Sequence, residues 1–147
     1  MPLKTDAVGK TWGPAVYAVG REKIREYALA VGESDPLYLD PEAARAAGHA
    51  DVVAPPMFAV VYSAPAMGPV IFDPDVAMNF AMMVHGGQEF AWGPLVVAGD
   101  EISTTVECLS IEARDGRAYY VFESVSVNQR GETVCTGTWT NIVRGVQ

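Results

Sequence analysis

The sequence predicts an α+β fold in which an antiparallel sheet wraps around one apolar helix. Three observations predict it: helix-like segments fill the first third of the chain, an almost uninterrupted apolar segment covers residues 56–67, and four long strand-like runs follow residue 77. An apolar helix has to be covered by other elements to stay out of water, and here the sheet must cover it. The 147 residues, half of them hydrophobic, fit a single domain spanning residues 1–147.

The first predicted helix covers residues 21–31, directly after Gly20. The charged side chains fall on one face, and Gly32 supplies a stop signal at the C-terminal end. The opposite face is apolar, because hydrophobic side chains recur three and four residues apart, at Ile24, Tyr27, Ala28 and Val31.

Two further helices are predicted. The second begins with Asp40 as its N-cap and Pro41 in its first turn, and ends at Gly48. The third is the apolar segment 56–67, which is hydrophobic nearly all round and is therefore expected to be buried on every side. We expect Pro65 to kink or end this helix.

The second half of the chain predicts strands, because its long runs are rich in β-branched and aromatic residues. Asp115-Gly116 is a strong hairpin signal between two of these runs. Gly86-Gly87, inside the first run, predicts a bulge or a close backbone approach. The predicted strand runs are residues 80–92, 101–113, 117–129 and 132–143.

Composition excludes several classes of function. A formal net charge of −8 and the absence of any Lys/Arg run argue against a nucleic-acid partner. Residues 1–10 contain no apolar segment of a secretory signal, and prolines interrupt residues 52–72 too often for a membrane span. Cys108 and Cys135 lie in strand-like runs and belong to no C-x-x-C pair, so we expect free buried thiols and a cytoplasmic location.

Two segments carry a resemblance to a known family. Residues 33–40 read Glu-Ser-Asp-Pro-Leu-Tyr-Leu-Asp, and residues 54–58 read Ala-Pro-Pro-Met-Phe. With these, the chain resembles the N-terminal-type domain of MaoC-like hydratases and dehydratases, and especially the non-catalytic subunit of heterodimeric (3R)-hydroxyacyl thioester dehydratases. The likeness extends over nearly the whole chain, through residues 21–28, 85–92 and 97–100. It implies the hot-dog fold.

The resemblance also identifies a departure from the family's catalytic pattern, which is Asp-x-Asn-Pro-x-His-x-Asp. Aligned on Pro36, this chain has Glu33, Asp35 and Tyr38 where the family has Asp, Asn and His. In the family, the Asp and His activate the water that adds to a 2-enoyl thioester. A general base at neutral pH needs a pKa near 7, and tyrosine, with a pKa of about 10, is a poor replacement. Glu33 is one methylene longer than Asp, and a misplacement of about 1 Å can cost on the order of a hundredfold in rate.

A second departure lies at the start of the apolar helix. Catalytic members have His-Gly there, and a backbone N–H polarises the thioester carbonyl as an oxyanion-hole donor does. This chain has Pro55-Pro56, and neither proline has an N–H, although Met57 and Phe58 do. The resemblance therefore implies a substrate-shaping subunit whose catalytic Asp/His pair belongs to a partner.

The resemblance further implies a partner and a substrate. The partner is a second hot-dog chain, in a homodimer or a heterodimer, and the substrate is an acyl thioester of coenzyme A or of a carrier protein. No metal or redox cofactor is implied. The acyl group is expected to contact Met57, Phe58 and Val61 beside the helix, and His85 is expected to line the acyl pocket or the dimer seam.

Other interpretations stay open at the level of sequence. The chain could be a self-sufficient homodimeric hydratase or thioesterase that uses Glu33, Asp35 or His85, with His49 as a further substitute base. It could instead be a non-enzymatic protein that binds acyl-CoA or lipid. Glu33, Asp35 and Asp40 are most simply turn and cap residues, and the five methionines at 57, 67, 78, 82 and 83 either line a pocket or fill the core.

Overall fold

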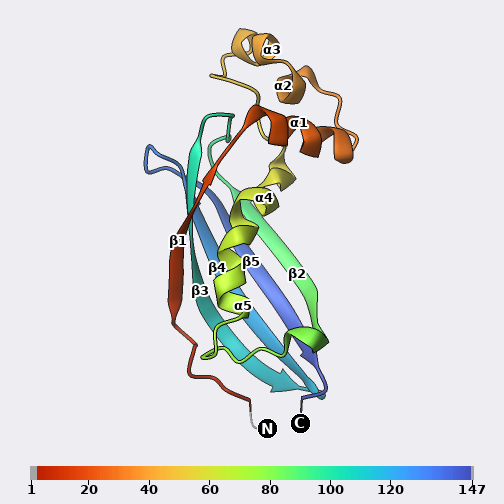
Figure 1. The fold of residues 1–147 in the computed structure, drawn as a ribbon, viewed down its shortest axis with the longest axis vertical. Coiled ribbons are helices and arrows are strands. Elements are labelled where there is room, and N and C mark those ends of the chain that lie inside the picture. The colour runs from red at the N-terminus through yellow and green to blue at the C-terminus, as the bar shows by residue number, and fades with distance from the viewer. Residues whose placement is uncertain (1–2, 147) are drawn as a thin grey trace.

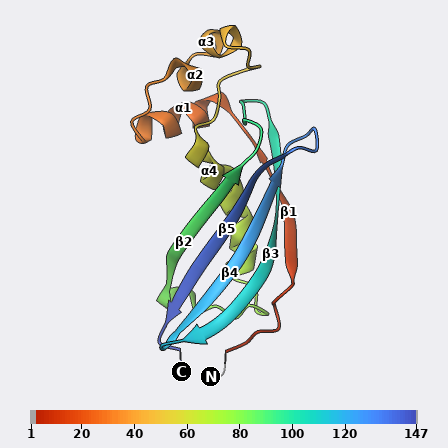
Figure 2. The ribbon, with the colours of Figure 1, turned by 180° about the vertical axis from the view of Figure 1, so that it is seen from behind.

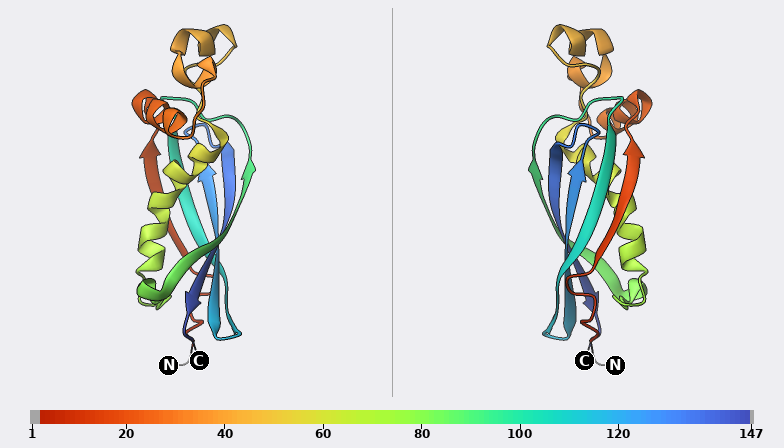
Figure 3. Two further views of the ribbon diagram at one scale, coloured as in Figure 1. Left: turned by 90° about the vertical axis from the view of Figure 1, so that its right-hand side faces the viewer. Right: turned by 90° about the vertical axis from the view of Figure 1, so that its left-hand side faces the viewer.

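The protein folds into a five-stranded antiparallel sheet whose concave face holds a helical segment (Figures 1 and 3). This computed structural model describes residues 3–146, so the first two residues and the last residue of the predicted 1–147 domain lie outside it. The predicted α+β hot-dog arrangement is confirmed. The strand order is β1-β3-β4-β5-β2. The strands are β1 Thr11–Ala18, β2 Met83–Trp92, β3 Glu101–Arg114, β4 Arg117–Val127 and β5 Thr133–Arg144.

Three short helices stand at one end of the sheet (Figure 1): α1 Arg21–Ala30, α2 Pro36–Leu39 and α3 Pro41–Ala46. Helix α1 ends before Gly32, which has a φ of 77°, so the predicted stop is confirmed. The prediction of Val31 on the buried face is wrong, because the helix ends at residue 30 and Val31 is 54% exposed. Sequence analysis did not predict α2.

The apolar segment is helical from Pro56 to Ile71, with two 3₁₀ turns in it: η1 Pro56–Phe58, α4 Ala59–Ser63, η2 Ala64–Met67 and α5 Gly68–Ile71. Pro65 tightens the helix into a 3₁₀ turn without ending it. The prediction that it is buried on every side is wrong. Phe58 and Val70 face the sheet and are fully buried, whereas Met57 on the opposite side is 49% exposed. The reason is geometric: one sheet covers only one face of a helix.

The predicted strands are confirmed to within three residues at each end, and a 3₁₀ turn, η3 Phe80–Met82, precedes β2. Asp115 and Gly116 both have positive φ angles and form the β3–β4 hairpin turn. The predicted bulge is confirmed by the shift in the β2–β5 register between His85 and Gly87. Strand β1 was not predicted, and its pairing with β3 is also irregular, between Trp12 and Ala15.

Two groups of buried residues form the core. One lies beneath the lower half of the helix and includes Val70, Val106 and Phe122. The other joins α1 to the start of the helix through Ile24 and Phe58. The first group contains Cys108 and the second Cys135, both buried and free, as predicted. Within residues 3–146, no helix is long and apolar enough to cross a membrane.

Candidate functional site

The residues at the family's catalytic positions lie in the cap, the name we give to residues 21–51 with helices α1, α2 and α3 (Figure 1). Glu33 and Asp35 are exposed, and Tyr38 is half-buried. Burial raises the pKa of the Tyr38 phenol, and the nearby charges of Glu33 and then Asp35 raise it further. The structure therefore brings the three side chains together, and Tyr38 keeps its proton at neutral pH.

The aspartates of this segment have local structural roles. The carboxylate of Asp35 accepts a hydrogen bond from the Leu37 N–H at 2.9 Å and caps α2. Asp40 accepts one from the Glu42 N–H at 3.0 Å and caps α3. The prediction that these two residues are turn and cap residues is confirmed.

An ion pair closes the cap. The Arg21 guanidinium at the start of α1 binds the Asp51 carboxylate with two contacts of 2.8 Å. This arginine holds the pKa of Asp51 below its usual range. Because Arg21 and Asp51 are the first and last residues of the cap, the pair holds the two ends of the cap together where it joins the body of the protein. His49 lies half-buried in the same return segment.

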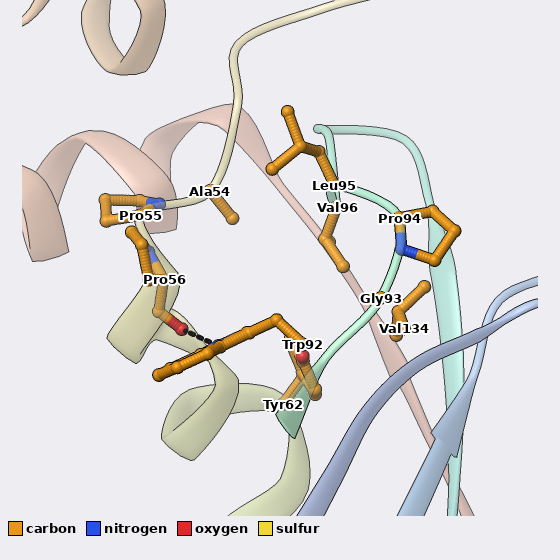
Figure 4. A pocket seen from close by; sticks show the side chains of 10 residues that line it. All are labelled: Ala54, Pro55, Pro56, Tyr62, Trp92, Gly93, Pro94, Leu95, Val96 and Val134. Carbon is orange, nitrogen blue, oxygen red and sulfur yellow. Dashed lines mark hydrogen bonds between the residues drawn. The ribbon is translucent and has the colours of Figure 1, made fainter. Parts of the chain in front are cut away.

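At the start of the apolar helix, the backbone polar groups largely bind one another. The Phe58 N–H donates to the Pro55 carbonyl at 2.9 Å. The Pro56 carbonyl accepts the indole N–H of Trp92 at 2.8 Å, which ties the end of β2 to the helix (Figure 4). Of the two backbone N–H groups that directly follow the prolines, those of Met57 and Phe58, the second is therefore engaged in a hydrogen bond within the chain.

A cavity of about 250 Å³ lies beside this helix start (Figure 4). Its walls are apolar and come from three places: the helix start, the end of β2 with the loop after it, and β5. Among the lining residues are Pro55, Pro56, Tyr62, Trp92, Leu95 and Val134. Burial raises the pKa of Tyr62 far above its usual range, so its hydroxyl stays protonated. The cavity can therefore enclose an apolar group and offer it a single phenol.

Asp100 fixes the loop that forms one wall of this cavity. This carboxylate is 3% exposed. It accepts hydrogen bonds from the Val97 N–H at 3.0 Å and from the Gln129 side chain at 2.8 Å. The β2–β3 loop is therefore tied to the β4–β5 hairpin, and the wall formed by Pro94 and Leu95 is held in place.

The residues predicted to contact substrate are only partly brought together. Phe58 is fully buried under the rings of Tyr27 and Tyr62, and Val61 is half-buried. Neither these residues nor Met57 lines the cavity. The Phe58 ring instead supports the cavity wall from behind, through its contact with Tyr62.

His85 lies far from the cavity, near the start of β2. Its ring meets the edge of Trp139 with centroids 5.9 Å apart. Seven residues of strand separate His85 from Trp92, which corresponds to roughly 20 Å at about 3.3 Å per residue. Within residues 3–146, no group of three His, Cys, Asp or Glu side chains is arranged to hold a metal ion.

Trp92, Pro94 and Leu95 are the site residues that sequence reasoning missed. The sequence Trp92-Gly93-Pro94 indicated only a turn. A signal was nevertheless present. Trp92 stands at the end of a strand, next to Gly93-Pro94, and a tryptophan there needs apolar neighbours for its ring and a hydrogen-bond acceptor for its indole N–H.

Comparison with known proteins agrees with this arrangement. Residues 6–137 match the family described as "FAS1-like, dehydratase domain region". A UPF0336 protein of Saccharopolyspora erythraea is 42% identical over 146 residues, covering 99% of this chain and 94% of that protein. A UPF0336 protein of Clavibacter michiganensis is 44% identical over 146 residues, covering 99% and 98% of the two chains.

Two solved structures have the same fold at 30% identity or above. One is the C-terminally truncated HadBC (3R-hydroxyacyl-ACP dehydratase) complex of Mycobacterium tuberculosis, with a TM-score of 0.81 and 30% identity over 95% of this chain and 99% of that one. The other, a MaoC-like dehydratase, has a TM-score of 0.81 and 32% identity, covering 94% of this chain and 42% of the longer one. The chain therefore belongs to the FAS1-like dehydratase domain region family, among the MaoC-like hot-dog hydratases and dehydratases.

Proposed function

We propose that this chain is the substrate-shaping, non-catalytic subunit of a (3R)-hydroxyacyl-thioester dehydratase, an enzyme that also runs in reverse as an R-specific 2-enoyl-thioester hydratase. The catalytic Asp and His belong to a second hot-dog chain. The observation that carries this proposal is Tyr38, which occupies the position of the catalytic base and whose pKa is raised rather than lowered.

The reaction needs a group that takes a proton from water near neutral pH. Tyr38 stays protonated and cannot take that proton. Asp35, which stands where the family has Asn, uses its carboxylate to cap α2. Glu33 is exposed on the turn before that helix. The cap thus keeps the shape of a catalytic segment without its acid–base pair.

The start of the apolar helix supports the same conclusion. The two prolines there have no N–H with which to polarise a thioester carbonyl. The Phe58 N–H is bound to the Pro55 carbonyl. An oxyanion site in this chain would depend on Met57 alone, whereas such sites in acyl chemistry use preorganised donors aimed at the developing charge.

What the chain retains is an apolar cavity next to the helix start, suited to an acyl group. Because the reaction moves water and a proton, it requires no electron transfer, and we propose no cofactor beyond the thioester. The HadBC structure, which matches 95% of this chain, is described as a complex, and this supports a hot-dog partner here. The free buried thiols fit a cytoplasmic location.

The test is hydration of short and medium 2-enoyl-CoA by the purified chain, alone and co-expressed with a hot-dog protein that has the intact Asp/His pattern. We expect turnover only in the mixture. The matched control is the mixture in which the partner's catalytic His is changed to Ala, which should be inactive. Turnover by the chain alone, lost in Glu33→Gln, would contradict the proposal and favour a self-sufficient hydratase.

The apolar cavity also supports a second candidate, a non-enzymatic protein that binds acyl-CoA. Calorimetric titration of an acyl-CoA separates the two candidates. Tight binding together with no turnover in any pairing would favour the binding protein, whereas binding together with turnover in the mixture would favour the subunit.

A further inference from the structure

Three arginines stand apart from every other basic residue of the chain. Of the ten basic residues, seven have a carboxylate oxygen within 4.0 Å: Lys4, Lys10, Arg21, Lys23, Arg25, Arg45 and Arg130. The other three are Arg114, Arg117 and Arg144, and no ion pair is formed by them within residues 3–146. Glu112 and Asp115 are close in sequence to these arginines, but neither forms an ion pair with them in this part of the chain. In a chain with a net charge of −8, three cations with no carboxylate partner among the described residues are a distinct feature.

These three arginines form one row on one face of the sheet. Arg117 of β4 is directly opposite Arg114 of β3 and also directly opposite Arg144 of β5. Directly opposite residues in an antiparallel pair point to the same face. That face is the outer one, because the neighbouring Ala118 and Val143 are buried on the helix side. Figure 2 looks onto this outer face, which no helix covers.

The row is organised around Tyr119. The Arg114 guanidinium stacks over the Tyr119 ring, 4.0 Å from its centre. The neighbouring guanidinium groups, Arg114 first and then Arg117, lower the pKa of the phenol. Like charges directly opposite one another on adjacent strands destabilise a sheet, so an anion bound along the row would relieve this repulsion.

The shape of the row indicates the kind of anion. Adjacent strands are about 4.8 Å apart, so the row is roughly 10 Å long. It is exposed and lies on the outer face of the sheet, whereas small-molecule sites are concave. Carboxylates on successive turns of a helix are separated by about 5.4 Å, close to the spacing between the arginines. Guanidinium groups bind carboxylates with two parallel hydrogen bonds.

We propose that Arg114, Arg117 and Arg144 form a docking surface for an acidic helix of the acyl carrier protein that presents the thioester. This inference rests on the proposed function, in which a hot-dog partner acts together with this chain, and it goes further by assigning the thioester to a carrier protein. Strand β2 begins at the arginine end of the sheet, where Met83 is opposite Val143, and ends at the cavity. If the β2 edges of two chains pair antiparallel, the arginine row of this chain lies beside the catalytic cap of its partner.

The experiment is titration of a fluorescently labelled, acidic acyl carrier protein with the full chain, alone and in complex with its partner. We expect binding that weakens as NaCl is added. Arg117→Glu, in the middle of the row, should weaken it by at least about tenfold. Arg25→Glu is the matched control on α1, with the same change of charge, and should stay within about twofold. The milder Arg114→Gln/Arg144→Gln double variant should fall between them.

Three results would overturn the proposal: no binding by the wild-type chain, equal weakening by Arg25→Glu, or displacement of the carrier by inorganic phosphate. The last would assign the row to a phosphate group. Hydration of 2-enoyl-CoA by the mixture is measured in parallel with Arg117→Glu. Because that substrate needs no carrier, unchanged turnover separates failure of the docking surface from failure of the proposed function.

Discussion

The sheet and the cap hold their shape in different ways. Along β4, every second side chain from Ala118 to Ser126 is buried against the helix. In the cap, α1 buries Ile24 and Ala28, α3 buries Ala44, and α2 buries none. The cap depends instead on Asp35 and Asp40 at helix N-termini and on the ion pair between its first and last residues, Arg21 and Asp51.

This difference explains how the proposed replacement of catalytic residues could leave the shape of the cap unchanged. The family residues preserved here, Pro36 and Asp40, set backbone conformation, whereas Glu33 and Tyr38 lie outside those hydrogen bonds. Replacing a base in such a segment leaves the fold intact, while replacing an inward side chain of β4 does not. The following predictions test this contrast, from the largest expected effect to the smallest.

The largest effect is expected in the sheet. Phe122 is fully buried and meets the Trp12 ring edge-on at 6.4 Å. Phe122→Ala should therefore lower the free energy of unfolding by about 3–5 kcal/mol. Urea denaturation followed by circular dichroism measures this loss. A loss below about 1 kcal/mol would contradict the view that stability is concentrated in the sheet.

The next effect concerns the link between the N-terminal segment and the loop after α5. Asp73 accepts hydrogen bonds from Lys10 and Trp12, both at 2.7 Å. The Lys10 hydrogen bond is the main cause that lowers the pKa of Asp73 to about 2. A lowered pKa stabilises the fold at pH values above the unfolded pKa of about 4. That contribution is lost as the pH falls from about 4 towards 2.

Scanning calorimetry over this pH range, on the wild type and on Asp73→Asn, tests the link. The variant should have the lower Tm near neutral pH, and the two curves should converge in acid. Parallel curves at all pH values would mean that the charge of Asp73 contributes nothing.

A smaller and local effect is expected in the cap. Asp40→Ala removes the N-cap of α3 and should cost about 1 kcal/mol. Hydrogen exchange should become faster for the amides of residues 41–47 and stay unchanged in β3 and β4. Asp40→Asn is the control, because asparagine caps a helix about as well. Faster exchange throughout the sheet would mean that cap and sheet unfold as one unit.

The smallest effect is expected at Tyr38, which aligns with the His of the family pattern. Tyr38→Phe removes only the phenol oxygen and should change the free energy of unfolding by less than about 0.5 kcal/mol. Activity of the mixture with the catalytic partner should also be unchanged. Loss of that activity with normal stability would assign Tyr38 a chemical role and would contradict the proposal that this position takes no part in the reaction.

Much of the fold could be predicted because its signals are local. Asp115-Gly116 adopts the positive φ angles that a tight hairpin needs, and Gly32 and Gly48 end their helices as expected. Strand β1 escaped prediction because Gly13 and Pro14 interrupt its alternation and place an irregularity in its pairing. Likewise α2 is a four-residue turn that depends on one capping aspartate.

In the candidate site, too, the local features could be predicted from the sequence and the features that depend on the whole fold could not. Glu33, Asp35 and Tyr38 could be found because they lie within six consecutive residues. The cavity could not, since Tyr62, Trp92 and Val134 are far apart in sequence and meet only after the sheet has wrapped around the helix. The failure of Met57 and Phe58 to line it follows from the helix start, where one side chain faces solvent and the other the core.

The irregularities in β1 and β2 have a consequence for assembly. These are the two outermost strands of the sheet, and an outermost strand with unpaired backbone groups can template the addition of further chains without limit. Both carry a break in register, at Trp12–Ala15 in β1 and at His85–Gly87 in β2. At Gly86 the backbone lies so close to the Ile142 side chain that a Cβ atom would force this side chain to shift. Each break twists its strand away from a flat continuation, so the sheet resists fibre-like growth and favours assemblies that close after a few copies.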